Sequence, residues 1–330
     1  MADKIKIVIT DHLEPDFEWE KERLPLDKIV FETYQLKHSS EDELIEKIKD
    51  ADCVVVNMAP MTARVINSLK KCKTIIRHGI GYDNVDLKAA TKKSIRVGNV
   101  PDYCPNEVAE HAIELIFAAT RKVFLMRKVL EDSSRKGQWD FAPIYPIYSL
   151  KGKTLGIVGC GRIGSCVLTK GRGLEMNVLV CDPYLSQKRK KELGISVVPF
   201  EKVLKEADVV TMHTPLTDET RGMIGEAQLK QMKRTAFLIN TSRGPVVDLV
   251  ALAKALKEGW IAGAGIDVYD KEPPPPDMEL FKLPNAVLTP HLGWYSEESN
   301  WSIREKILED MLRFVAGQPP RFVVNKDVKP

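Results

Sequence analysis

The chain has 330 residues, of which 44% are hydrophobic and 29% are charged, proportions typical of folded globular proteins and not of disordered ones. This length exceeds a single core of ordinary size and predicts two domains. Lysine and arginine number 49 against 46 aspartate and glutamate residues, so the net charge is only +3. No strong field therefore favours a nucleic acid or a membrane surface as partner.

The N-terminal segment MADKIKIVIT leads directly into a strand pattern and lacks the features of a secretory signal. No apolar run approaches the length that spans a bilayer. The six cysteines show no C-x-x-C pair and no spacing typical of a disulfide framework or a zinc site. We therefore expect reduced thiols, no metal site and a cytoplasmic location.

Short apolar runs alternate with helical patterns over the first hundred residues. The predicted elements are strands at 5–10, 53–56 and 74–77, and helices that begin at Ser40 and cover 62–70. Ser40 and Glu43 have the spacing of a capping box, and Leu44, Ile45 and Ile48 supply the buried stripe of the helix that follows. This βαβα rhythm predicts a small doubly wound parallel sheet.

A second alternation of strands and helices occupies the rest of the chain. A long helix begins at Pro105, a residue suited to a first turn, and a last amphipathic helix near 303–315 ends before Gly317. The strands predicted between them lie at 154–158, 177–181, 208–212, 236–239 and 262–266. Because these runs are continuously apolar, they suit parallel strands covered by helices on both faces.

Three glycines, Gly159, Gly161 and Gly164, have the G-x-G-x-x-G spacing directly after a predicted strand and at the start of a helix. The first permits a tight turn, the second lets the backbone approach a pyrophosphate, and the third allows close packing of helix and sheet. Asp182 ends the next strand, where a carboxylate can accept hydrogen bonds from a ribose and repel a 2′-phosphate. The pattern predicts a dinucleotide site that favours NAD over NADP.

The basic run at 188–191 has two interpretations. It could clamp a phosphate group, or it could form the solvated face of a surface helix. Its position beyond the end of the predicted strand favours the solvated face.

Three segments after predicted strands carry the candidate catalytic residues, which are Arg243 in LINTSRGPVVD, Glu272 in GIDVYDKEP and His291 in LTPHLGWYSEES. An imidazole exchanges protons near neutral pH, and a guanidinium has a planar fork that suits a carboxylate. A hydrogen bond from Glu272 would favour the imidazolium form of His291. This set suits hydride transfer to or from C2 of a 2-keto or 2-hydroxy acid.

The segments GCGRIG, HTPLTDETRGMIG, NTSRG, GIDVYDKEP and TPHLGWYSEES together resemble the D-2-hydroxyacid dehydrogenase family, over nearly the whole chain. The resemblance implies an NAD-dependent enzyme in which Arg243, Glu272 and His291 are the catalytic residues. It assigns Asp267 to the nicotinamide carboxamide. It implies further cofactor contacts at Arg162, Ile163, Thr214, Pro215, Thr220 and Thr241.

The segment RHGIGYDNVD looks like the substrate loop of that family, in which the backbone amides of Ile80 and Gly81 would receive the substrate carboxylate. Within the family, Arg77, the segment VPDYC and Trp294 are most similar to the C-terminal-binding-protein subgroup. The matching arginine and tryptophan border the substrate there. The resemblance therefore makes Arg77 and Trp294 candidates for substrate selectivity.

The resemblance also implies the domain order. A Rossmann NAD-binding domain of residues 103–296 is inserted into a flavodoxin-like substrate domain of residues 1–102 and 297–330. Family members are usually homodimers, with the helix from Pro105 prominent in the contact, so we expect a homodimer. The histidines at 78, 111 and 213 are interpreted as structural or cofactor-lining residues.

Two alternatives to this enzyme remain open. The first is an NAD(H)-sensing binding protein of the same fold, similar to the corepressors of the C-terminal-binding subgroup, and the second is a Rossmann enzyme of S-adenosyl ligands. The complete catalytic set favours the dehydrogenase. The side chain of the acid stays open, with glyoxylate, hydroxypyruvate, phosphoglycerate, pyruvate and larger keto acids all sharing the atoms that Arg243 and His291 would handle.

Overall fold

The computed structural model describes residues 4–328. By its internal contacts the chain divides into two compact units. The first unit comprises the residues up to Tyr103 together with those from Ser296 onward, and the second unit runs from Cys104 to Tyr295. Within the described residues, no helix has both the length and the apolar character needed to cross a bilayer.

The first unit contains a five-stranded sheet in which every neighbouring pair is parallel. Its strands are β1 (Ile5–Ile9), β2 (Ile29–Thr33), β3 (Cys53–Val56), β4 (Thr74–Arg77) and β5 (Arg96–Gly98). Their order is β2-β1-β3-β4-β5, the flavodoxin-like order, in which the winding direction reverses between β1 and β3. The predicted sheet is confirmed, although its two edge strands, β2 and β5, had no predicted counterpart.

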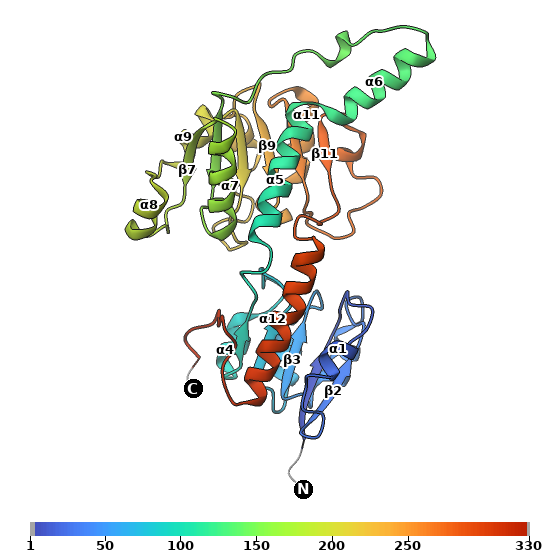
Figure 1. Ribbon diagram of the computed structural model, residues 1–330, viewed down its shortest axis with the longest axis vertical. Coiled ribbons are helices and arrows are strands. Elements are labelled where there is room, and N and C mark those ends of the chain that lie inside the picture. The colour runs from blue at the N-terminus through green and yellow to red at the C-terminus, as the bar shows by residue number, and fades with distance from the viewer. Residues whose placement is uncertain (1–3, 329–330) are drawn as a thin grey trace. The chain divides into compact units, whose positions relative to one another are not determined.

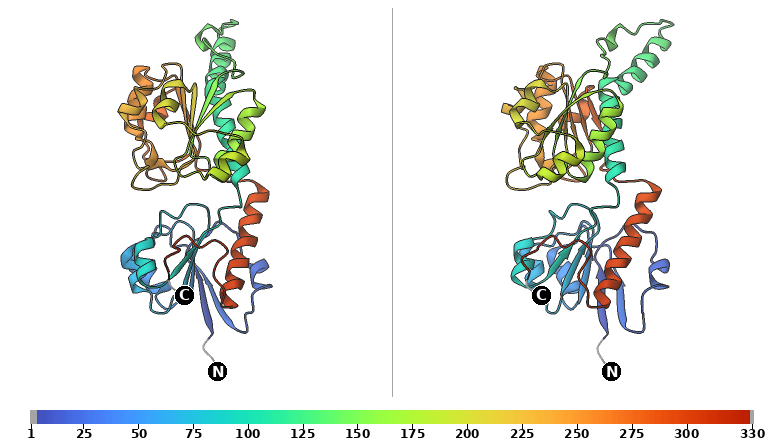
Figure 2. Two further views of the ribbon diagram at one scale, coloured as in Figure 1. Left: turned by 90° about the vertical axis from the view of Figure 1, so that its left-hand side faces the viewer. Right: turned by 60° about the vertical axis from the view of Figure 1, so that its left-hand side comes forward.

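Helices cover both faces of this sheet. They are α1 (Glu18–Lys21), α2 (Glu41–Ile48), α3 (Ala63–Ser68), α4 (Leu87–Lys92) and α12 (Glu297–Val315). Successive residues of β1 point to opposite faces, so Val8 packs with α2 to α4 while Ile7 and Ile9 pack with α1 and α12. Figure 2 shows the red α12 and the blue α1 on one side of the strands and the lighter blue to teal helices on the other.

The second unit contains a six-stranded parallel sheet with the order β11-β10-β9-β8-β6-β7. Its strands are β6 (Thr154–Val158), β7 (Asn177–Cys181), β8 (Val209–Met212), β9 (Phe237–Asn240), β10 (Gly263–Ile266) and β11 (Ala286–Leu288). A single parallel bridge joins Val197 to Val180 in β7. Val197 therefore stands where the third strand of a Rossmann sheet lies, and the winding reverses between β6 and β8.

The helices of the second unit lie in two layers. They are α5 (Pro105–Thr120), α6 (Val123–Arg135), α7 (Arg162–Gly173), α8 (Gln187–Leu193), α9 (Phe200–Glu206), α10 (Glu226–Leu229) and α11 (Leu249–Glu258), with short 3-10 turns at Ala142–Ile144, Gly244–Val246 and Glu279–Lys282. Helices α5 and α7 share one core with Leu155 and Ile239, and α9 to α11 share the opposite core with Leu238. Pro105 occupies the first turn of α5, as predicted.

Helix α6 and the segment after it differ from the rest of the second unit. Figure 1 shows α6 running away from the strands of that unit. Large apolar side chains stay exposed along it and after it, including Phe124 at 62%, Trp139 at 79% and Tyr145 at 63%. The helix buries only Ser133, so its apolar side chains contribute little to the core of this unit.

Candidate active site

The turn between β6 and α7 contains the three glycines of the predicted dinucleotide motif. Gly159 has a φ of 87°, a conformation that side chains disfavour. A Cβ on Gly164 would lie 2.1 Å from the carbonyl oxygen of Gly159, whereas a Cβ on Gly161 would enter open space. The turn and the helix are thus in contact, and the backbone at Gly161 is left accessible beside the unpaired first-turn amides of α7. These features fit a bound pyrophosphate.

Asp182 lies directly after β7 and is tied to the glycine turn. Its Oδ2 accepts the backbone amide of Cys160 at 2.8 Å, and its Oδ1 accepts the amide of Tyr184 at 3.0 Å. Each carboxylate oxygen keeps capacity for a further donor. The position next to the glycine turn fits the predicted contact with a ribose.

Two buried hydroxyls stand at the ends of neighbouring strands. Thr214 follows β8 and Thr241 follows β9, and neither Oγ1 atom has a hydrogen-bond partner among the described residues. Buried hydroxyls are normally paired, so both sites fit a polar ligand along this edge. Thr220 has a different function, because its hydroxyl donates to the carbonyl of Pro215 at 2.6 Å and accepts the amide of Thr217 at 2.8 Å. It closes the loop after β8.

His291 and Glu272 form the closest acid–histidine pair at this edge. Nδ1 of His291 lies 2.9 Å from Oε1 and 2.8 Å from Oε2 of Glu272. Since a carboxylate accepts, Nδ1 is the donor, and Nε2 has no hydrogen bond to any described residue. Burial alone would raise the pKa of Glu272, but its hydrogen bond and Coulombic attraction to His291 hold that pKa below its usual value.

The loop from Thr289 to Gly293 that carries His291, hereafter the histidine loop, is held by Asp267. This carboxylate, which follows β10, accepts the amide of Leu292 at 3.1 Å, the amide of Gly293 at 3.0 Å and the hydroxyl of Thr289 at 2.6 Å. His291 itself has a φ of 57°, which costs a residue with a Cβ about 1 kcal/mol or more. The bonds to Asp267 hold the loop in that conformation.

Arg243 reaches the same edge through a compact turn after β9. The buried Asn240 accepts the amide of Ser242 at 3.0 Å and donates to the carbonyl of Arg243 at 2.9 Å. A Cβ on Gly244 would lie 2.0 Å from the carbonyl carbon of Tyr269, so this turn packs tightly against the segment that leads to Glu272. Arg243 is among the charges that lower the pKa of Glu272, which brings the three predicted catalytic residues into one neighbourhood.

In the first unit, the loop from Arg77 to Gly81, hereafter the anion loop, presents backbone amides. Its carbonyl groups are occupied: the guanidinium of Arg77 donates to His78 at 2.5 Å, the amide of Val100 to Gly79 at 3.0 Å, and the side chain of Asn99 to Ile80 at 2.6 Å. The amides of Ile80 and Gly81 have no hydrogen bond to any described residue. Two adjacent free amides fit an anion, as the loop pattern predicts.

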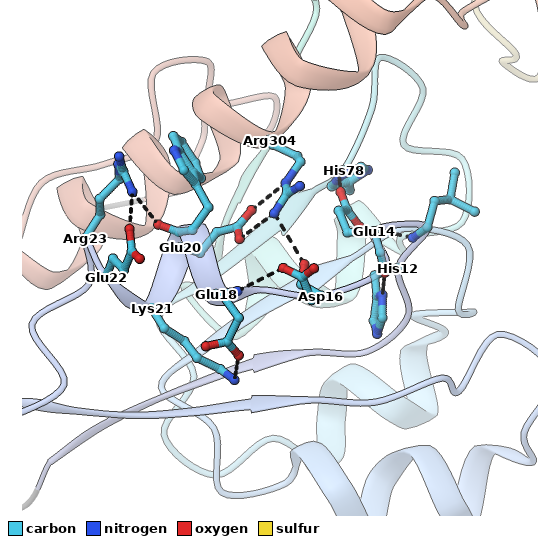
Figure 3. A network of polar contacts seen from close by, with 12 residues as sticks. His12, Glu14, Asp16, Glu18, Glu20, Lys21, Glu22, Arg23, His78 and Arg304 are labelled. Atoms are coloured by element: carbon cyan, nitrogen blue, oxygen red, sulfur yellow. Dashed lines mark hydrogen bonds and ion pairs between the residues drawn. The ribbon is translucent and has the colours of Figure 1, made fainter.

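Beside the anion loop, His78 joins a buried polar network (Figure 3). Its Nε2 lies 2.9 Å from Oε1 of Glu14, which is only 3% exposed. Next to this pair, Arg304 in α12 forms a two-point contact with Glu20 in α1, each bond 2.8 Å long. Burial alone would raise the pKa of Glu14, but His78 outweighs it and lowers that pKa to about 2. The hydrogen bond between His78 and Glu14 anchors the start of the anion loop.

The remaining predicted residues have less specific surroundings. Trp294 is half-buried in the second unit and packs edge-to-face on Tyr295 at 5.3 Å. His213 bonds the hydroxyl of Thr211 at 2.9 Å, and burial lowers its pKa to about 3, so it is neutral. In α8, Lys188 and Lys191 are exposed, but Arg189 reaches Ser165 beside the glycine turn at 3.3 Å.

The sequence did not predict a positioning function for three residues that hold the site in place: Asn240, Glu14 and His111. The side chain of Asn240 bonds the backbone of the turn that follows it. An asparagine directly after a predicted strand was the one sequence signal that could have indicated this function. Glu14 and His111 act on distant segments, with His111 bonding Thr289 across 178 positions of sequence. No local pattern reveals such a pairing.

A dinucleotide turn and an acid–histidine pair on one edge of a Rossmann sheet are typical of nicotinamide-dependent dehydrogenases. The chain belongs to the D-isomer specific 2-hydroxyacid dehydrogenase family, whose NAD-binding domain model matches residues 113–293. It is an NAD-dependent oxidoreductase of 2-hydroxy acids, as predicted. The alternative of an enzyme of S-adenosyl ligands is wrong.

Comparisons with individual proteins support the same family. The chain is 42% identical to a glyoxylate reductase of Korarchaeum cryptofilum, over 97% of this chain and 92% of the relative. It is 40% identical to a glyoxylate reductase of Pyrococcus furiosus, over 96% and 91%. Among solved structures, a D-lactate dehydrogenase of Aquifex aeolicus in complex with NAD and lactic acid matches with a TM-score of 0.86 and 29% identity, over 98% of this chain and 99% of that one.

These relatives correct one expectation. The predicted likeness to the C-terminal-binding-protein subgroup is not supported, because the relatives at 40–42% identity are three glyoxylate reductases and a D-3-phosphoglycerate dehydrogenase. Arg77, the segment VPDYC and Trp294, on which that likeness depended, are too few positions to separate subgroups of one family. The alternative of a corepressor-like sensor depended on the same likeness and therefore loses its support.

Proposed function

We propose that the protein reduces a small 2-keto acid, such as glyoxylate, with His291 as the proton donor and Arg243 and Glu272 as its catalytic partners. The contact of Glu272 with Nδ1 of His291 carries this proposal. It commits Nδ1 to the carboxylate and leaves Nε2 as the ring nitrogen that can deliver a proton. Three of the four relatives at 40–42% identity are glyoxylate reductases, which favours glyoxylate as the acid, and the fourth is a D-3-phosphoglycerate dehydrogenase.

Each of the three residues has a separate step in this mechanism. When bound, NAD supplies or accepts the hydride. His291 Nε2 gives a proton to the developing alkoxide during reduction and takes it back during oxidation. Glu272 stabilises the imidazolium through its negative charge and orients the ring. Arg243 holds the substrate carboxylate and polarises the carbonyl, since its guanidinium presents several donors in one plane.

The second unit is proposed to bind NAD through the residues of its carboxyl edge. Gly159, Gly161, Arg162, Ile163 and Gly164 would hold the pyrophosphate. Asp182 would hold the ribose, and the loops with Thr214, Pro215, Thr220, Thr241 and Asp267 would line the remainder. The two unpaired hydroxyls of Thr214 and Thr241 support this assignment. So does the open space at Gly161.

The first unit is proposed to be the substrate domain. Its anion loop offers the free amides of Ile80 and Gly81 to the substrate carboxylate. Arg77 supports the loop from within, because its guanidinium donates to the carbonyl of His78. Arg77 and Trp294 remain candidates for contacts with the substrate side chain.

A homodimer is proposed around the exposed α6 segment. Phe124, Leu130, Trp139, Phe141 and Tyr145 are between 47% and 79% exposed, and apolar patches of this kind mark interfaces. We expect the purified protein to sediment as a dimer and Trp139→Ser with Phe124→Ser to shift it toward the monomer. A wild-type chain that sediments as a monomer at micromolar concentration would disprove this.

A cytoplasmic location is also proposed. All six cysteines are free thiols, and only Cys166 is not fully buried. Reduced, unpaired cysteines are typical of proteins in reducing compartments.

The test of the function is a panel of 2-keto acids with NADH and NADPH, followed by nicotinamide absorbance. We expect turnover with glyoxylate or another small keto acid and preference for NADH. His291→Ala should lower kcat by about 10²–10⁴-fold, while NADH still binds. As a matched control, His38→Gln alters an exposed histidine and should leave the rate unchanged. A His291→Ala protein that keeps most of its rate would exclude His291 as the proton donor.

A further inference from the structure

We propose that His111 in α5 is a positioning residue for the histidine loop, acting as an imidazolium that binds Asp267 and Thr289. The proposal concerns a residue outside the catalytic set. It rests on the proposed function only in so far as His291 is the proton donor, because the contacts of His111 are with the loop and not with the substrate.

The hydrogen bonds around His111 assign its protonation state. Nε2 lies 2.9 Å from the hydroxyl of Thr289 and 3.3 Å from Oδ1 of Asp267. The hydroxyl of Thr289 donates its single hydrogen to Asp267 at 2.6 Å. It can therefore only accept a hydrogen bond from Nε2 of His111. Nδ1 lies 3.1 Å from a carboxylate oxygen of Glu114, which can only accept. Both ring nitrogens are therefore donors, and the ring carries a positive charge.

Burial and charge around the ring agree with this state. The side chain of His111 is 14% exposed and that of Asp267 only 2%, so the two charges face each other away from water. A buried carboxylate needs a partner charge or several donors to stay ionised. Burial alone would lower the pKa of His111, but the bond and charge of Asp267, with a contribution from Glu114, raise it.

Asp267 transmits the effect of His111 to the loop. Its two oxygens take the amides of Leu292 and Gly293, which directly follow His291, and the hydroxyl of Thr289, which precedes it by two residues. The space is narrow: a Cβ on Gly293 would lie 2.9 Å from Oδ2 of Asp267 and 3.1 Å from a ring carbon of His111. The ring of His111 thus contacts both the carboxylate of Asp267 and the loop that this carboxylate holds.

The loop needs this support because His291 has a left-handed backbone. Without a strong acceptor for the two following amides, the segment would relax toward ordinary conformations. The ring of His291 would then leave its position against Glu272. A displacement of about 1 Å at a reacting group costs on the order of 10²-fold in rate. We therefore expect the loss to appear in kcat.

The experiment compares His111→Gln with wild type. Glutamine can still donate to Thr289 but carries no charge. We expect kcat with a small keto acid to fall by about 10- to 100-fold, with NADH affinity by fluorescence titration and keto-acid KM within about two-fold. Backbone amide exchange, read by mass spectrometry on the peptide covering 289–293, should become faster. His111→Lys restores a cation and should recover part of kcat. His38→Gln serves as the matched control.

Two results would overturn the proposal. The first is a His111→Gln protein whose kcat and loop exchange both equal those of wild type. The second is a variant in which kcat and NADH affinity fall together with a lower melting temperature, which indicates a general loss of folding. If His291→Ala proves active, the proposed function fails. The exchange rate at 289–293 in His111→Gln still decides the role of His111.

Discussion

The anion loop and the histidine loop follow strands of two different parallel sheets, and they are held in opposite ways. In the anion loop three carbonyl groups are occupied, so the amides of Ile80 and Gly81 are left for a ligand. In the histidine loop two amides are occupied by Asp267, so the side chain of His291 is what the loop presents. Which backbone groups are paired decides whether a loop offers its backbone or its side chain.

Each loop also depends on a buried carboxylate and a histidine. In the first unit the histidine, His78, belongs to the loop and Glu14 comes from a distant segment. In the second unit neither Asp267 nor His111 belongs to the loop that they hold. The anion loop is thus anchored at one end, and the histidine loop along its length. Changes near the histidine loop should therefore act on kcat, and those near the anion loop on KM.

The largest effect is expected for Asp267→Asn. An amide in place of the carboxylate turns an NH₂ group toward at least one of the donors at Thr289, Leu292 and Gly293, and a buried mismatch of this kind costs about 1–3 kcal/mol. Steady-state kinetics should show kcat lower by about 10²-fold or more. Asp270→Asn, at an exposed position three residues along, should keep the wild-type rate. Equal rates for the two variants would contradict the assignment of Asp267.

Glu272→Gln should come next. The amide keeps the shape but removes the charge that faces Nδ1 of His291, so the imidazolium loses its partner. We expect kcat to fall by about 10- to 50-fold, without faster amide exchange at 289–293. Glu279→Gln, in an exposed pair with Lys282, is the control. Faster loop exchange in Glu272→Gln would mean that Glu272 holds the loop, not the ring.

Glu14→Gln tests the anchor of the anion loop through stability. The pKa of Glu14 is lowered from 4.5 to about 2, so its ionised form stabilises the fold above pH 4.5. That contribution is lost as pH falls from 4.5 toward 2. The variant should be less stable at neutral pH by about 1–2 kcal/mol, since glutamine keeps an acceptor, and its stability should fall less steeply over that pH window. Denaturant unfolding at several pH values measures both, with exposed Glu18→Gln as control. An equally steep acid dependence in Glu14→Gln would contradict the ion pair.

Asn99→Ala should have the smallest effect. It removes the donor to the carbonyl of Ile80, so the peptide that carries the Gly81 amide loses its orientation. We expect KM for the keto acid to rise by about five-fold, equivalent to about 1 kcal/mol, with kcat close to wild type. Asn67→Ala, at an exposed position, provides the comparison. A fall in kcat of Asn99→Ala without a change in KM would contradict the prediction that the anion loop acts on KM and the histidine loop on kcat.

Most of the sheet architecture and the glycine turn could be predicted because they follow from local order. A strand, a turn with glycines and a helix lie within about twenty residues, and each residue of the motif acts on its neighbours. Strands β2, β5 and β11 escaped prediction because none of them has a long apolar run: β2 ends in Glu32 and Thr33, and β5 and β11 have three residues each. Helix α6 was not predicted either, although its sequence is amphipathic. The candidate catalytic residues could be proposed from their residue types and from their positions after strands.

The supports of the site could not be predicted. His111 was interpreted as a packing residue because its helix is apolar, yet its ring bonds Thr289 far along the chain. His78 and Glu14 are separated by 64 positions and share no motif. A histidine in a helix has the same appearance in sequence whether it packs or carries a charge. Only the tertiary partners of its two nitrogens distinguish the cases.

The left-handed backbone at His291 has a consequence for attempts to make the protein more heat-resistant. Glycine or asparagine accepts that conformation at little cost, so random libraries selected only for survival of heating would tend to enrich both at position 291. Such variants would be selected for their thermal stability, but each would lack the imidazole of His291 and would therefore have a much lower kcat. Durability and turnover compete at this one position, and any selection scheme has to score them together.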